Sequence, residues 1–64
     1  MDIQKIRDEV AAEFGIEPGR LEAGSFSRPQ WEILFPLLKE CILDDTEDNA
    51  RRYLHQKAKF LTAK

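Results

Sequence analysis

The chain has 64 residues, of which 42% are hydrophobic and 34% charged, with ten lysines and arginines against twelve acids. This length allows one domain at most, over residues 1–64, because independently folding domains usually run to about 100 residues or more. The composition is near the globular average, which excludes a disordered or fibrous chain. A domain this small buries only about 60% of its unfolded surface, so we expect a partner subunit to contribute to its stability.

Charged residues near the N-terminus bear on where the protein resides. Asp2, Lys5, Arg7 and Asp8 interrupt the apolar character there, which argues against a signal peptide and against a membrane span of about 18 residues. The single cysteine, Cys41, cannot form an internal disulfide, and short secreted domains usually carry several. We therefore expect a cytoplasmic protein without a membrane span.

The N-terminal segment predicts one helix followed by a loop. Residues 2–14 place apolar side chains at helical spacing, with Asp2 as a capping residue and Gly15 where the helix stops. Residues 15–27 contain three glycines and Pro18, which predicts an ordered loop with at most one helical turn.

Residues 28–43 predict the second helix, which Ser27 caps and Pro29 begins. Pro36 falls on the polar side, where it either kinks the helix or splits it into two short ones. The apolar residues cover an arc of about 200°, roughly twice the usual width: Trp31, Ile33, Leu34, Phe35, Leu37, Leu38, Cys41 and Ile42.

The third helix is predicted over residues 46–61, because a cluster of acids at 44–48 suits a helix N-terminus and apolar residues follow at helical spacing. The predicted fold is all-α: a small three-helix bundle in which the helix over 28–43 is central and the loop over 15–27 closes one end.

The wide apolar arc of residues 28–43 predicts a surface for a partner. Two neighbouring helices can cover little more than one side of this arc, so the other edge is left free. The side expected to be covered carries Trp31, Leu34, Leu38 and Ile42. We expect a second copy of the chain to pack on this edge, whose residues are Ile33, Leu37 and Cys41.

Few residues could support catalysis. Cys41 lies within the apolar arc, where burial keeps a thiol protonated, and His55 lies between two positive charges on the polar face of the third helix. These two residues have no further ligands at the spacing of a zinc site, and the acids at 44–48 lack the pattern of a calcium loop. We therefore expect no catalytic residues, no metal and no cofactor, and predict that the protein is not an enzyme.

The charges are distributed unevenly along the chain. Residues 1–49 hold all twelve acids and five bases, whereas residues 50–64 hold five bases and no acid. The bases define a basic face on the third helix, formed by Arg51, Arg52, His55 and Lys59. This face either neutralises the acidic part of the fold or binds the phosphates of nucleic acid, and we favour neutralisation.

The first third of the chain contains two patterns that suggest other functions, and the first is a possible DNA-binding motif. Val10-Ala11, Phe14-Gly15-Ile16 and Leu21 are similar to a helix-turn-helix over about 7–26, which would imply DNA or RNA binding.

The same region, through Phe14-Gly15-Ile16-Glu17-Pro18, Leu21 and Gly24-Ser25-Phe26, resembles the first helix and loop of acyl carrier proteins. The resemblance implies an acidic helical bundle and places Ser27 where that family carries its prosthetic group. Because Phe26-Ser27-Arg28 replaces the Asp-Ser-Leu motif, it suggests a carrier-like domain without a modified serine.

The preferred function is a non-catalytic protein–protein interaction module that forms a homodimer and acts as a small regulator or assembly factor. A nucleic-acid-binding regulator is the alternative, and a degenerate carrier-like domain is the third hypothesis.

Overall fold

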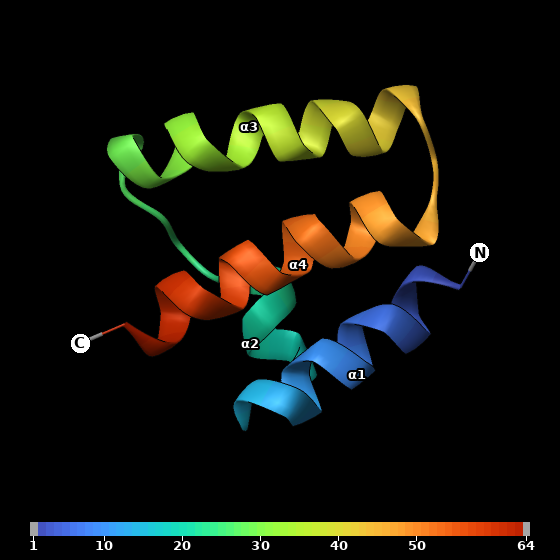
Figure 1. Ribbon diagram of the computed structural model, residues 1–64. Coiled ribbons are helices and arrows are strands. Elements are labelled where there is room, and N and C mark those ends of the chain that lie inside the picture. The colour runs from blue at the N-terminus through green and yellow to red at the C-terminus, as the bar shows by residue number, and fades with distance from the viewer. Residues whose placement is uncertain (1, 64) are drawn as a thin grey trace.

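The computed structural model describes residues 2–63, which form four helices and no strand (Figure 1). The first, third and fourth helices occupy the three segments predicted to be helical, to within one residue at each end. A further short helix lies inside residues 15–27, so the expected three-helix bundle is in fact a four-helix fold. The helices are α1 (Ile3–Phe14), α2 (Pro18–Ala23), α3 (Arg28–Leu43) and α4 (Glu47–Thr62).

Local signals set the two ends of α1. The Asp2 carboxylate accepts hydrogen bonds from two backbone N–H groups of the first turn, at 3.1 and 3.2 Å, which satisfies donors that the helix itself cannot. Gly15 has a φ of 68°, a left-handed conformation that glycine adopts without steric cost. The N–H of Ile16 then donates to the carbonyl of Ala11 at 2.8 Å and closes the helix end.

Tertiary packing explains why α2 is helical despite its glycine. Pro18 begins the helix, but the preceding Glu17 makes no side-chain cap. Leu21 is fully buried in the main core cluster, together with residues of α1 and α4. A six-residue helix is not stable in isolation, so burial of Leu21 between its neighbours holds α2 in place.

The helix α3 is continuous through Pro36, so the alternative of two short helices is not adopted. Its start is fixed by a reciprocal pair of hydrogen bonds: the Ser27 hydroxyl accepts from the N–H of Gln30 at 3.4 Å, and the Gln30 side chain accepts from the N–H of Ser27 at 2.9 Å. This capping box satisfies two backbone donors at once.

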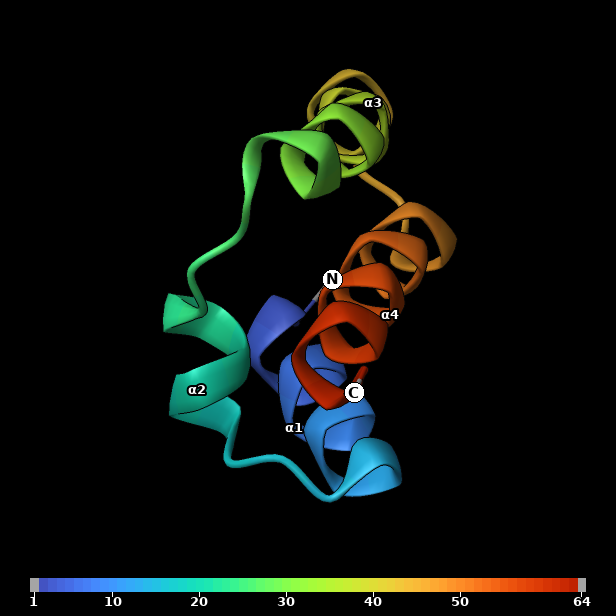
Figure 2. The same ribbon diagram turned by 90° about the vertical axis from the view of Figure 1, so that its left-hand side faces the viewer.

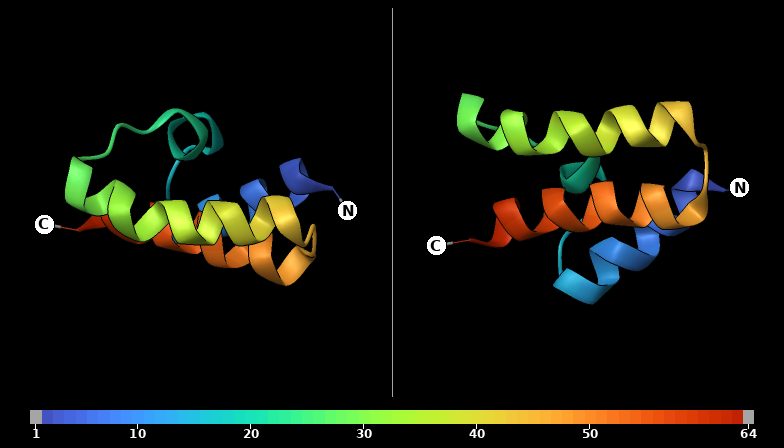
Figure 3. Two further views of the ribbon diagram at one scale, coloured as in Figure 1. Left: turned by 90° about the horizontal axis from the view of Figure 1, so that it is seen from above. Right: turned by 45° about the horizontal axis from the view of Figure 1, so that its top comes forward.

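The central helix is α4, which packs against each of the other three. Figures 1 and 3 show it between α3 on one side and α1 on the other. Small residues of α4, Ala50 and Ala58, are fully buried and let its neighbours approach closely. The main core cluster lies between α1, α2 and α4 and contains Ile6, Val10, Ala11, Ile16, Leu21, Ala50, Leu54 and Ala58.

The expectation that residues 28–43 would form the central helix is wrong. Among the helices of residues 2–63, α3 packs against α4 alone, and Figure 2 shows it apart from α1 and α2. Leu34 is its one fully buried residue. The most apolar helix is therefore also the most peripheral, because only one side of its wide apolar arc is covered.

Candidate interaction site

A side of α3 that α4 does not cover carries large exposed apolar residues. Phe35 is 57% exposed, Ile42 73% and Leu43 75%. These residues line a shallow groove formed by α3 alone, which we call the outer face. The full set of residues on the outer face is Glu32, Phe35, Pro36, Leu38, Lys39, Ile42 and Leu43.

The 100° rotation per helical residue explains why the outer face is uncovered. Leu34 lies against α4, and Leu37 and Cys41 are half-buried within 60° of it on the helical wheel. Phe35 and Ile42 project roughly 80–100° away from Leu34, beyond the reach of a single neighbouring helix. One packing partner cannot bury an arc of this width, so a row of apolar side chains remains in solvent.

A chain of aromatic contacts fixes the position of Phe35. Its ring stacks on Trp31, with the ring centroids 5.0 Å apart. Trp31 contacts Phe26 edge to face at 5.6 Å, and Phe26 lies 6.2 Å from Phe60 of α4. Such aromatic pairs add stability beyond their buried area. Phe35 is therefore held in an exposed position by contacts that lead back to α4.

The outer face also carries two opposite charges. Glu32 and Lys39 are seven residues apart, so they lie on the same side of α3, two turns from each other. Arg28 lies 4.0 Å from Glu32, and both side chains are more than two-thirds exposed. An exposed pair at this distance contributes little to stability, so the carboxylate of Glu32 remains available for a closer partner.

The three residues predicted from the sequence as the partner interface lie elsewhere on α3. Ile33 is 52% exposed. Leu37 is half-buried and borders α4 beside Arg51 and His55. Cys41 is half-buried against the core, where burial and then the nearby Asp45 raise the pKa of its thiol. The exposed apolar surface is thus continuous on the outer face rather than on this edge.

The expectation that Ile42 lies on the covered side of the helix is wrong, since Ile42 is exposed, and sequence reasoning did not single out Phe35 or Leu43 as exposed. The width of the apolar arc indicated that one side would be uncovered, but the side was set by how α3 packs on α4. This docking depends on contacts between residues far apart in the sequence, so no local signal identifies it.

Acids surround the predicted basic face of α4. Arg51 forms ion pairs with Glu9 of α1 and with Glu47, and hydrogen bonds to these two carboxylates raise its pKa. The pair between Arg52 and Asp48 measures 2.9 Å.

The third residue of the basic face also meets an acid of α1. His55 lies 3.2 Å from Glu13, and its ring packs edge to face on Phe14. Lys59 is exposed. Three of the four residues of the basic face thus have acidic partners within the fold, which favours neutralisation over phosphate binding as the use of this face.

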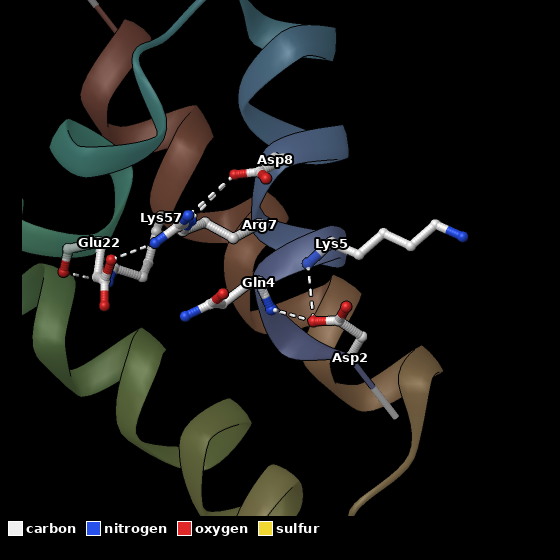
Figure 4. Close-up of polar contacts among 7 residues, drawn as sticks. All are labelled: Asp2, Gln4, Lys5, Arg7, Asp8, Glu22 and Lys57. Atoms are coloured by element: carbon white, nitrogen blue, oxygen red, sulfur yellow. Dashed lines mark hydrogen bonds and ion pairs between the residues drawn. The ribbon is translucent and has the colours of Figure 1, made fainter.

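A buried lysine lies on the other side of the molecule. Lys57 is 7% exposed, and its Nζ donates a hydrogen bond to the backbone carbonyl of Glu22 at 3.2 Å. The same atom lies 5.4 Å from the ring centre of Tyr53 and 5.8 Å from that of Phe26. Figure 4 shows the Glu22 carboxylate paired with Arg7, which also binds Asp8.

Burial lowers the pKa of Lys57, and Glu22 opposes this shift. The aromatic faces and the single carbonyl replace only part of the hydration that the ammonium loses. The spacing of four residues between Tyr53 and Lys57 is the sequence signal that places the amine over this ring.

The lowered pKa of Lys57 gives a pH-dependent stability. Because the unfolded chain binds this proton more tightly than the folded one, the contribution of Lys57 is full above the unfolded pKa near 10.5 and is lost as the pH falls through its lower folded pKa. We expect the free energy of unfolding of wild type to rise relative to that of Lys57→Met as the pH is raised from neutral toward 10.5, measured by urea denaturation.

The exposed Lys59→Met variant, on the same helix, controls for the loss of one positive charge. A difference between wild type and Lys57→Met that stays constant over this pH range would contradict the assignment of a desolvated ammonium at Lys57.

Within residues 2–63, no three metal-ligating side chains come together, and no helix in this range is long and apolar enough to cross a membrane. No protein-family model, curated protein or solved structure matches the chain.

Proposed function

We propose that the protein is a non-catalytic interaction module that self-associates through the outer face of α3 and serves as a small regulator or assembly factor. The observation that carries this proposal is the exposure of Phe35, Ile42 and Leu43 along a helix that is packed on one side only. Contiguous apolar residues of this kind on a soluble protein usually mark an interaction site.

The doubling of buried area in a symmetric contact favours a second copy as the partner. Full burial of a phenylalanine, isoleucine or leucine side chain contributes about 1.5–3 kcal/mol, and a symmetric interface removes the same residues from water in both copies. The outer face is small, so we expect a weak dimer with a Kd on the order of 10–100 µM. Dimerisation would also stabilise α3, whose one partner among the helices of residues 2–63 is α4.

Two charged substitutions on the same helix test this function. Ile42→Glu places a carboxylate on the outer face, whereas Ile33→Glu places one at another exposed isoleucine of α3. We expect wild type and Ile33→Glu to change from monomer to dimer over about 5–500 µM, and Ile42→Glu to remain monomeric. Size-exclusion chromatography with light scattering measures this, and circular dichroism checks that each variant keeps its helices.

Other outcomes would change the assignment. A wild type that is monomeric throughout this concentration range would overturn self-association. Dissociation by Ile33→Glu, with Ile42→Glu still dimeric, would instead favour the edge formed by Ile33, Leu37 and Cys41.

A further inference from the structure

We infer that the two copies of α3 pack antiparallel about a two-fold axis, with Glu32 of each copy paired with Lys39 of the other. This inference rests on the proposed self-association and specifies its geometry. It makes Glu32 and Lys39 the residues that determine the orientation of the dimer.

The spacing of the two charges on the outer face leads to this geometry. Seven residues of helix span about 10.5 Å, so Glu32 and Lys39 lie two turns apart on one side of α3. In an antiparallel pair whose two-fold axis passes between residues 35 and 36, position 32 of one copy lies opposite position 39 of the other. The single face therefore complements itself, because it carries one charge of each sign at equal distances from the axis.

The apolar residues of the outer face fit the same axis. It places Phe35 opposite Pro36 of the second copy at the centre of the interface, and Ile42 and Leu43 near the first turn of the facing helix. The two most exposed large hydrophobic residues of α3 would thus be covered at both ends of the contact.

A parallel arrangement would bring like charges together. It would place Glu32 beside Glu32 of the second copy and Lys39 beside its counterpart, and like charges across an interface oppose association. The 4.0 Å separation of Arg28 and Glu32 does not prevent the antiparallel pairing, because such an exposed contact is weak.

Charge reversal distinguishes the two orientations. In the antiparallel dimer, Glu32→Lys and Lys39→Glu each turn two attractive pairs into two repulsive ones, so we expect the Kd to rise about tenfold or more. The double variant Glu32→Lys/Lys39→Glu restores both attractive pairs, and its Kd should return to within about threefold of wild type. Sedimentation equilibrium measures the Kd of all four proteins.

Disulfide trapping gives a second readout in a Cys41→Ala background. With cysteines at both 32 and 39, mild oxidation should link the two copies. Glu32→Cys alone should not link them, because its two copies lie about 10.5 Å apart along the helix axes, beyond the roughly 7 Å limit between the Cα atoms of a disulfide. Efficient linking of the single variant would indicate parallel helices and overturn the inference.

The outcomes separate this inference from the proposed function. If Ile42→Glu dissociates the dimer but neither single charge reversal weakens it, the outer face self-associates in another geometry and only the inference fails. If wild type does not associate, both fail. Weakening by each single reversal without recovery in the double variant would also overturn the pairing.

Discussion

Replacing Leu34 by alanine should cost about 2–5 kcal/mol and release α3 from the rest of the protein. Leu34 is the one fully buried residue of this helix and lies outside the main core cluster. Since α3 packs on α4 alone, no other helix holds it once this contact is lost. We therefore expect local detachment of α3 in Leu34→Ala, with α1, α2 and α4 still packed together.

Urea denaturation with two probes measures this effect. Trp31, the single tryptophan of the chain, reports on α3 through its fluorescence, and circular dichroism reports on all four helices. In Leu34→Ala the Trp31 signal should change at lower urea than the helical signal. Leu43→Ala, which removes an exposed leucine from the same helix, should leave both midpoints close to wild type. Unchanged midpoints in Leu34→Ala would show that other contacts hold α3.

Replacing Leu21 by alanine should have a similar cost, about 2–5 kcal/mol, but a global effect. Leu21 is fully buried and is one of the three largest such side chains. It packs in the main core cluster shared by α1, α2 and α4. A domain of this size has a total stability of roughly 3–10 kcal/mol, so the loss removes much or all of it.

Both probes should report the loss together in Leu21→Ala, because α4 forms one side of the core cluster and is also the support of α3. The neighbouring exposed Arg20→Ala, also in α2, controls for changes in helix propensity. Denaturation of Leu21→Ala with the wild-type midpoint would contradict the central role of this residue. A fluorescence transition that precedes the loss of helix would indicate that α3 does not depend on this core.

Features of the fold that depend only on residues close together in the sequence could be predicted from it. Helix ends are marked by the capping hydrogen bonds of Asp2 and Ser27 and by the backbone angles of Gly15. These features involve only a few consecutive residues, so the residue types alone indicated where the helices begin and end. The start of α2 at Pro18 was suggested in the same way. Its full length was not, because burial of Leu21 outweighs the low helix propensity of Gly19.

The arrangement of the helices could not be predicted in this way. The apolar content of residues 28–43 suggested a central helix, but a central position requires apolar or small residues on several sides. In α4 the buried Ala50, Leu54 and Ala58 form one such side and the half-buried Tyr53 and Phe60 an adjacent one, although the helix has little total hydrophobicity. Likewise, the sequence indicated that part of α3 would be exposed, whereas the location of the outer face followed from the docking of Leu34 on α4.

The central position of α4 has a consequence for the order of events during synthesis. Ribosomes make α1, α2 and α3 before α4, yet each of the three packs on α4. The nascent chain therefore cannot complete its core cluster until residues 47–62 have left the exit tunnel. Until then α3 has no partner helix, so Leu34 cannot be buried.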